Sequence, residues 1–410
     1  MRRPRLLRGG HTALPKVVVA LCAMEFLEWM GGGAIIPLLP TYLRQHGSSI
    51  ALVGVVMGSY FAASMLTQYP LGRLADRLGP RPVILGGLAL FVLGCVGFAL
   101  VPGALAGIAF RALQGTGAGS ATVAGAATIG YVVPSEERGA AFGALYASQT
   151  LALAIGPLVG SVIGTASMRW LFLAAALAAG SAALPALGYL PHDGPHLGQP
   201  RQRRGFAQRA LSPGMLGATA VFVATGLLGG MYESCWSLLL HLRGASSIAI
   251  GLSWTLYCLP FAALSLSAGR LADRADRRTL AAVGICVSAV FACIYPLLHS
   301  VVLLVCVGCF EAVGAVLVTP AALSVLSSSV AHEDQGAAQG FIGTARTGAT
   351  ALAAAGCGAL FALSPRLAFD VTGGVLALLA ATVLVLWRQL PGRVQETGDL
   401  QITSGTPELG

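Results

Sequence analysis

The sequence contains little charge. Asp, Glu, Lys and Arg make up 10% of its 410 residues, and 56% of the residues are hydrophobic, whereas an average soluble domain has about 25% charged residues. A soluble protein this apolar would lack the polar side chains needed to cover its surface. Lipid removes that requirement, because acyl chains are as apolar as leucine. The composition therefore excludes an ordinary soluble domain and predicts an all-α integral membrane protein.

The sequence also lacks the motifs of cofactor and metal chemistry. It has no P-loop, no G-x-S-x-G motif, no zinc signature and no nucleotide-binding domain. Its nine cysteines lie in apolar stretches, and the pair at two-residue spacing, Cys306 and Cys309, has no histidine or second cysteine pair nearby. We therefore expect no metal, no cofactor and no enzymatic activity, and we interpret the cysteines as small buried hydrophobic residues.

What the sequence does contain is a series of twelve mostly apolar runs, each long enough to span a bilayer. The runs cover residues 15–43, 50–71, 82–101, 103–131, 139–164, 168–190, 211–240, 247–268, 279–298, 299–328, 337–362 and 365–390. The predicted segments on one side hold 19 of the 25 Lys and Arg residues, and those on the other side hold 4. Because basic loops remain cytoplasmic, this asymmetry predicts that both termini are cytoplasmic.

The two halves of the chain repeat each other. The sequence GRLADR occurs at Gly72–Arg77 and again at Gly269–Arg274, and the same offset pairs Tyr60 with Tyr257. Repeated halves are a known plan for secondary transporters, so we expect two pseudo-symmetric six-helix bundles. The expected organisation is an N-terminal arm (1–14), a first bundle (15–190), a cytoplasmic central loop (191–210), a second bundle (211–390) and a cytoplasmic tail (391–410).

The polar loop GRLADRLGPR, Gly72–Arg81, resembles the signature loop of the major facilitator superfamily, G-x-L-x-D-R-x-G-R/K-R/K. Six positions match, and Pro80 and Pro82 depart from the basic run; the matches are Gly72, Leu74, Asp76, Arg77, Gly79 and Arg81. The resemblance covers nearly the whole chain. It implies a conformational latch that stabilises the inward-closed state, made by Gly72, Asp76, Arg77, Arg81 and, in the repeat, Gly269, Asp273 and Arg274. We expect Asp76 to lie against a positive helix N-terminus near Gly336.

Two further motifs resemble those of the drug–proton antiporters of this superfamily. RALQGTG at Arg111–Gly117 resembles R-x-x-Q-G-x-G, which is linked to proton transfer in exporters, and Gly156, Pro157 and Gly160 match the antiporter motif G-P-x-x-G. An arginine inside a span costs about 2.5 kcal/mol or more, so Arg111 should face a carboxylate or a wet cavity. The alternatives are an arginine that snorkels to the membrane surface and, for the glycines, an ordinary packing face.

Acidic residues inside the spans are the candidates for proton coupling. Glu25 and Glu28 are three residues apart and therefore share a helical face. Two carboxylates this close in a medium of low dielectric constant cannot both ionise at low cost. We expect Glu25, Glu28 or both to carry the proton, with Arg111 as their partner. The alternative is a static Glu–Arg bridge that holds the bundle together.

Other polar and aromatic residues in the spans are candidates for substrate binding. Glu233 lies between Tyr232 and Trp236, and an acid beside aromatic rings suits a lipophilic cation; an interfacial aromatic belt with a snorkelling acid is the alternative. Glu311 and Arg346 are expected to form an ion pair within the second bundle. The remaining candidates for the cavity wall are Trp29, Gln114, Tyr146 and Gln149.

Together these features predict a secondary active transporter, in particular a proton-coupled exporter of amphipathic drugs or of a secondary metabolite in a bacterial inner membrane. Its expected partners are a small-molecule substrate, protons and the lipid bilayer, with no nucleic acid, and a monomer is sufficient. A proton-coupled importer or facilitator and a lipid or glycolipid flippase of the same fold remain alternatives.

Overall fold

The computed structural model describes residues 15–101, 103–134, 137–163, 167–191, 211–330 and 335–388. All regular structure in these ranges is helical, and each of the twelve predicted spans coincides with one helix or with consecutive helices. The expected N-terminal arm and the greater part of the central loop and C-terminal tail lie outside the described residues.

The first half contains two short helices, α2 (Leu39–Gln45) and α8 (Ala183–Tyr189), each of which continues a longer one. The longer helices are α1 (Lys16–Ile35), α3 (Ile50–Leu78), α4 (Pro80–Leu100), α5 (Ala104–Val132), α6 (Arg138–Ile163) and α7 (Met168–Ser181). In the second half, a π-helical turn, η2 (Tyr232–Trp236), and a 3₁₀ turn, η3 (Tyr295–Leu297), interrupt the α-helices. These helices are α10 (Pro213–Met231), α11 (Ser237–Leu242), α12 (Ser247–Arg274), α13 (Arg277–Ile294), α14 (Val301–Ala315), α15 (Val318–Ser329), α16 (Gln335–Leu363) and α17 (Pro365–Leu386).

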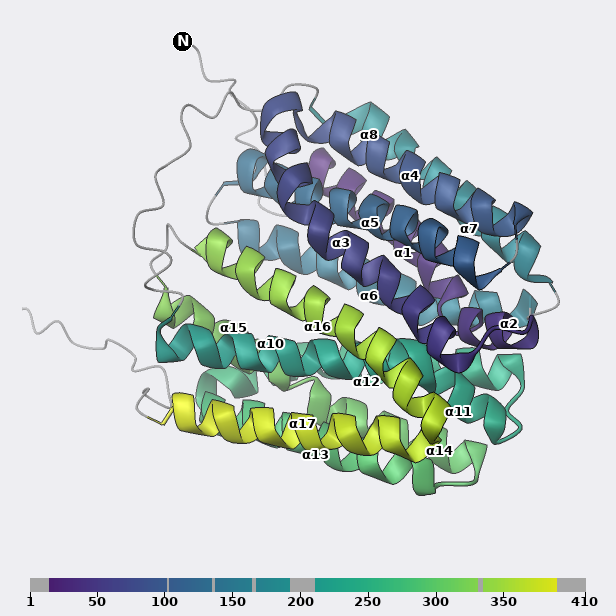
Figure 1. Cartoon of the computed structure of the whole chain (residues 1–410). Coiled ribbons are helices and arrows are strands. Elements are labelled where there is room, and N and C mark those ends of the chain that lie inside the picture. The colour runs from purple at the N-terminus through teal and green to yellow at the C-terminus, as the bar shows by residue number, and fades with distance from the viewer. Residues whose placement is uncertain are drawn as a thin grey trace, which may run out of the picture.

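Ten helical stretches among the described residues are both long enough and apolar enough to cross a membrane. The helices α5 and α12 have comparable lengths and pack within the same bundles. The α12 helix ends in the polar GRLADR repeat at Gly269–Arg274. The chain is thus a multi-pass membrane protein whose helices form two bundles (Figure 1).

Glycine permits the close approach of helices inside each bundle. A Cβ atom at Gly115 of α5 would lie 1.9 Å from the carbonyl oxygen of Tyr60 in α3, and one at Gly117 would lie 2.4 Å from the carbonyl oxygen of Gly87 in α4. Lipid gives helices no hydrophobic reason to associate, so close backbone packing at small residues supplies much of the attraction. The abundance of glycine in the sequence therefore has a direct structural use.

The two bundles meet along two helix pairs, α3 with α16 and α6 with α12. A Cβ atom at Gly54 of α3 would lie 2.7 Å from the carbonyl oxygen of Ala354, and one at Gly251 of α12 would lie 2.4 Å from the carbonyl oxygen of Pro157. Both contacts lie near the end of the molecule that carries α2 and α11, where α3 and α16 converge in Figure 1. We call this end, with residues 46–49 and 243–246, the closed end.

The signature loop lies at the opposite end. Gly79 links α3 to α4 with φ of 88°, a backbone conformation that favours glycine. Asp76 and Arg77 are exposed, Gly72 and Arg81 are partly exposed, and Asp76 forms no hydrogen bond or ion pair with any described residue. The expected contact of Asp76 with a helix N-terminus is therefore not made among the described residues. The side chains of Arg270, Asp273 and Arg274, and the surroundings of Gly269 and Gly336, lie outside the described part of the chain.

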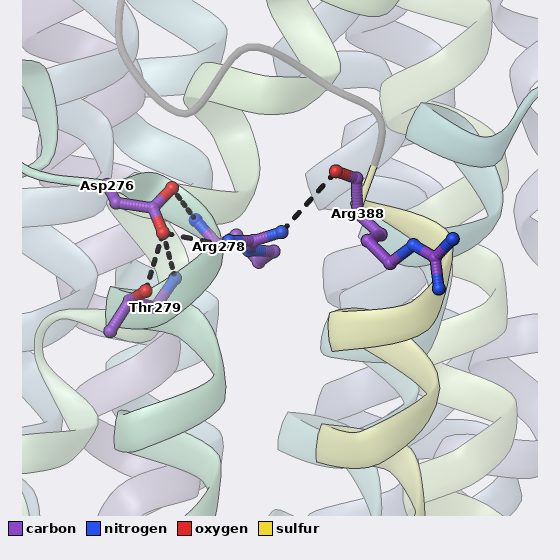
Figure 2. Close-up of polar contacts among 4 residues, drawn as sticks. All are labelled: Asp276, Arg278, Thr279 and Arg388. Carbon is purple, nitrogen blue, oxygen red and sulfur yellow. Dashed lines mark hydrogen bonds and ion pairs between the residues drawn. The ribbon is translucent and has the colours of Figure 1, made fainter.

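In the second half, Asp276 caps the helix that follows the repeat. Its carboxylate accepts hydrogen bonds from the backbone nitrogens of Arg278 and Thr279, both at 3.3 Å, and from the Thr279 hydroxyl (Figure 2). Arg278 donates in turn to the carbonyl oxygen of Arg388, 3.5 Å away, and so connects the start of α13 to the end of α17. A short polar side chain before the first helical residue is the usual N-cap.

The cysteines differ partly from expectation. Cys95, Cys235, Cys258 and Cys357 are buried, whereas others are partly exposed, and Cys286 and Cys306 are exposed on helix surfaces. An apolar thiol is stable on a lipid-facing surface, so an apolar sequence context does not by itself predict burial against protein in a membrane helix. None of the nine forms a disulfide.

Candidate functional site

Glu25 and Glu28 lie buried on α1, as their spacing predicts. One carboxylate oxygen of Glu25 accepts a 2.9 Å hydrogen bond from the side-chain amide of Gln149 on α6, and the other has no partner among the described residues. Glu28 is 3% exposed and accepts no hydrogen bond from any described residue. A buried carboxylate without donors is costly unless a proton or a cation joins it. The two acids therefore differ: Glu25 accepts a hydrogen bond from the protein, whereas Glu28 accepts none from the described residues.

Arg111 is fully enclosed between helices. Its Nη1 donates a 3.1 Å hydrogen bond to the side-chain oxygen of Gln114, and its guanidinium carbon lies 4.4 Å from the centroid of the Tyr60 ring. The snorkelling alternative is therefore wrong. Gln114 donates to the thiol sulfur of Cys95 at 3.1 Å and is itself buried. It supports Arg111 inside the first bundle and does not line a cavity.

Arg111 forms no ion pair with Glu25 or Glu28 among the described residues. The acid with which it interacts electrostatically is Glu233, which comes from the second half of the chain. The static Glu–Arg bridge within the first bundle is therefore also wrong. Arg111 instead joins the two halves electrostatically, because it is near an acid of the opposite bundle without touching it.

Tyr60 of α3 lies at the centre of these groups. Its hydroxyl interacts electrostatically with Glu25, Glu28, Arg111 and Glu233. The sequence offers one signal for this residue, the repeat offset that pairs it with Tyr257. That pairing indicates a repeated position but says nothing of the charges around it. We call Glu28, Tyr60, Arg111 and Glu233 the central site.

Glu233 lies in the π-helical turn η2, which interrupts the helix between α10 and α11. Such turns occur often at functional sites. One of its carboxylate oxygens is buried, and the side chain accepts no hydrogen bond from any described residue. Because α3 of the opposite bundle packs against η2, Glu233 lies between the halves, and an interfacial belt does not describe it.

The aromatic neighbours of Glu233 belong to the second bundle. Trp236 is buried, and its indole nitrogen donates a 2.9 Å hydrogen bond to Ser253, so this ring is part of the core and not of a cavity wall. The Tyr232 hydroxyl donates to the carboxylate of Glu311, as does that of Tyr295 at 2.6 Å. Tyr232, the residue before Glu233, therefore connects the central site to a second buried acid, Glu311.

The expected ion pair between Glu311 and Arg346 is not formed among the described residues. The two tyrosine hydroxyls occupy one oxygen of Glu311 inside the second bundle. Arg346 of α16 has an exposed side chain, and the titratable group near enough to affect it is Tyr146 of α6, in the opposite bundle. The prediction failed because helix rotation turns Arg346 away from its own bundle.

Two of the expected cavity residues remain accessible. Tyr146 is 59% exposed on α6. Trp29 is partly exposed on α1, next to Glu28, and its buried indole nitrogen has no hydrogen-bond partner among the described residues. Both side chains therefore carry a polar group that forms no hydrogen bond with the described residues.

The G-P-x-x-G motif brings α6 against α1. A Cβ atom at Gly156 would lie 2.7 Å from the carbonyl oxygen of Met30, and one at Gly160 would lie 2.1 Å from that of Ala34. Pro157 lies inside α6 and contacts Gly33. This is a packing face, as the alternative interpretation holds, and it directly follows the turn of α1 that carries Glu28.

Comparison with known families gives a match over almost the whole chain. The sequence profile described as Major Facilitator Superfamily matches residues 21–242 and 214–405.

Individual relatives are more distant. The tetracycline resistance protein of class E from Escherichia coli is 30% identical over 292 residues, which cover 66% of this chain and 69% of that protein. The inner membrane transport protein YajR of E. coli (strain K12) is 34% identical over 153 residues, which cover 35% of this chain and 33% of YajR. The multidrug resistance protein MdtM of the same strain is 30% identical over 39% of this chain and 38% of MdtM. The matches to YajR and MdtM therefore span about a third of each of those proteins.

Solved structures share the fold at low sequence identity. A bacterial homologue of the human lysosomal transporter Spinster, in an inward-facing and unoccupied conformation, aligns with a TM-score of 0.75 at 15% identity, over 92% of this chain and 98% of that one. A point mutant of the nucleoside transporter NupG aligns with a TM-score of 0.73 at 15% identity, over 90% of this chain and all of that chain.

Proposed function

The chain belongs to the Major Facilitator Superfamily and is a secondary transporter, and from its central acids we propose that it exports an amphipathic small molecule from a bacterial cell in exchange for protons. The observation that carries this proposal is a pair of carboxylates, Glu28 and Glu233, that come from opposite bundles and lack hydrogen-bond partners among the described residues. Each is available to a proton or to a cationic group of a substrate.

The proposed direction rests on the charge asymmetry of the loops and on the closed end. If basic loops remain cytoplasmic, the termini are inside and the closed end faces outward. The opposite end, which carries the signature loop, then faces the cytoplasm, in agreement with an unengaged Asp76. Substrate enters from the cytoplasm and binds at the central site.

In the proposed cycle, proton and substrate are exchanged because both compete for the carboxylate of Glu28. When the bundles rock and open the outer end, a proton from outside neutralises Glu28 and removes the attraction for the substrate cation. Arg111, held by Gln114 and the Tyr60 ring, is the cation near Glu233 when no substrate is bound. Asp76 then acts as a latch in the outward-facing state. The names of the relatives, which include tetracycline and multidrug resistance proteins, agree with this direction.

The test is uptake of the fluorescent cation ethidium into inside-out vesicles with an imposed acidic interior. We expect Glu28→Gln and Glu233→Gln each to lower gradient-driven uptake by about tenfold or more, because each loses a charged interaction of roughly 1.5–3 kcal/mol. Glu25→Gln should retain part of the activity, since Gln149 still has an acceptor. Glu137→Gln changes an exposed acid outside the site and serves as the matched control. Uptake that ignores both the gradient and the central variants would instead indicate a facilitator or a flippase.

A further inference from the structure

The central site does not use Arg346, a cation in the middle of a membrane-spanning helix. Its side chain is exposed, and its guanidinium has no hydrogen bond or ion pair with any described residue. Arg346 lies eleven residues after the start of α16 at Gln335, about 16 Å along the helix. A charge at that depth is expensive in lipid and belongs in a wet cavity, facing a functional partner.

The neighbours of Arg346 fix the direction in which it points. On one side its backbone carbonyl packs against α10, where a Cβ atom at Gly226 would lie 2.4 Å away. On another side α16 contacts α3, since a Cβ atom at Gly348 would lie 2.7 Å from the sulfur of Met65. The guanidinium interacts with Tyr146 of the first bundle. It therefore faces the space between the bundles, away from lipid.

The same contacts show how far Arg346 lies from the central site along the helix axes. Gly226 lies beside Arg346, and Gly230 lies beside Thr350, so α10 and α16 run in the same direction. Glu233 follows seven residues after Gly226, which places it about 10 Å further towards the closed end. On the facing helix, Tyr146 precedes by three residues Gln149, the hydrogen-bond partner of Glu25. Arg346 and Tyr146 thus form one layer, and Glu233 lies in the next layer towards the closed end.

We propose that Arg346 binds an anionic group of the substrate, so that the transported molecule is amphoteric, with a cationic group and an acidic group about 10 Å apart. A simple cation that approaches Glu233 from the open end passes an unpaired positive charge at Arg346, whereas an amphoteric molecule satisfies both layers. A guanidinium suits a carboxylate or phosphate because it donates two parallel hydrogen bonds, and the Tyr146 hydroxyl adds a donor in the same layer. This inference rests on the proposed function and specifies the substrate class of that site.

The test compares norfloxacin, a rigid molecule with an amine at one end and a carboxylate at the other, with its ethyl ester, which keeps the amine and loses the anion. Binding to the purified full-length protein is measured by fluorescence without any gradient. We expect Arg346→Gln to weaken norfloxacin binding about tenfold, as for the loss of one charge-assisted pair, and to leave binding of the ester unchanged. Arg346→Lys should retain most of the affinity, and Tyr146→Phe should weaken binding of norfloxacin more than binding of the ester. Arg366→Gln, which removes an exposed arginine paired with Asp370 at 3.0 Å, is the control.

Three results would overturn the inference: equal weakening of both ligands in Arg346→Gln, no weakening of either, or no binding of norfloxacin by the unmodified protein. Ester binding also reports whether each variant is folded. Failure of the proposed function has a different signature, because ethidium uptake would then be independent of the proton gradient while the discrimination between acid and ester by Arg346 persisted.

Discussion

Tyr60 organises the centre of the protein although it carries no formal charge. Its ring lies beneath the guanidinium of Arg111, and its hydroxyl interacts with acids from both bundles. A cation over an aromatic face gains about 0.5–2 kcal/mol, more when water is excluded. The ring and the hydroxyl therefore have separable roles: the ring positions Arg111, and the hydroxyl contributes to the electrostatics around Glu28 and Glu233.

Substitutions at Tyr60 separate these roles. We expect Tyr60→Leu to lower the melting temperature and to abolish ethidium uptake, because Arg111 loses its stacking partner at a cost of about 1–2 kcal/mol. Tyr60→Phe keeps the ring and should melt like the unmodified protein, while the pH profile of uptake shifts because the hydroxyl near the acids is gone. Melting curves and uptake at several pH values check both statements. Identical melting of the two variants would contradict a stacking role for the ring.

At the scale of helices, glycine positions decide which elements pack closely. The motif glycines of α6 face α1 with no space for a side chain, so they hold the helix that carries Glu25 and Glu28 against the helix that carries Gln149. Other glycines, such as Gly180 of α7, have no atom within 4 Å of the Cβ position and face outward. Glycines that look alike in the sequence therefore differ in how much they contribute to helix packing.

The contrast gives a matched pair of substitutions. A methyl group at Gly160 would lie 2.1 Å from the carbonyl oxygen of Ala34, so Gly160→Ala must separate α6 from α1, at a cost of about 1–3 kcal/mol. Gly180→Ala meets nothing and should be neutral or slightly stabilising, because alanine favours a helix. Thermal unfolding in detergent measures both. Equal stability of the two variants would show that the α1–α6 contact is looser than the structure indicates.

At the scale of the whole molecule, the two bundles touch closely at the closed end, while the signature loop at the other end is unengaged. The contacts between α3 and α16 depend on Gly54 and Gly58, whose Cβ positions lie 2.7 and 2.8 Å from carbonyl oxygens of α16. Helix pairs without side chains between them separate and rejoin without rotamer changes. This interface is therefore suited to the opening that alternating access requires.

A bulky residue in this interface should shift the balance between conformations. Gly54→Leu cannot be accommodated against α16, so the closed end should open and the opposite end should narrow, as expected when one of two states is disfavoured. Spin labels at Leu78 of α3 and Ser327 of α15, both exposed on opposite bundles, report the distance at that end. We expect shorter distances in Gly54→Leu, and no change in Gly86→Leu, where nothing lies within 4 Å of the Cβ position. An unchanged distance in a folded Gly54→Leu protein would argue against coupled rocking of the bundles.

The sequence by itself determined the number and order of the spans, the repeat of the two halves and the presence of acids within the helices. These properties are local, because a span is defined by its own length and apolar composition. The sequence showed that Glu25 and Gln149 are polar residues within spans, but it did not predict the hydrogen bond between them.

The tertiary structure alone decided which charged groups meet. Arg111 contacts Gln114 and Tyr60 and not the acids of α1, and Glu311 binds tyrosines and not Arg346. A helix that is apolar on all sides shows no face in its sequence, so its rotation is set by the glycines and other small residues at which it packs against its neighbours. That rotation places Arg346 in the space between the bundles, where we propose that it selects the substrate.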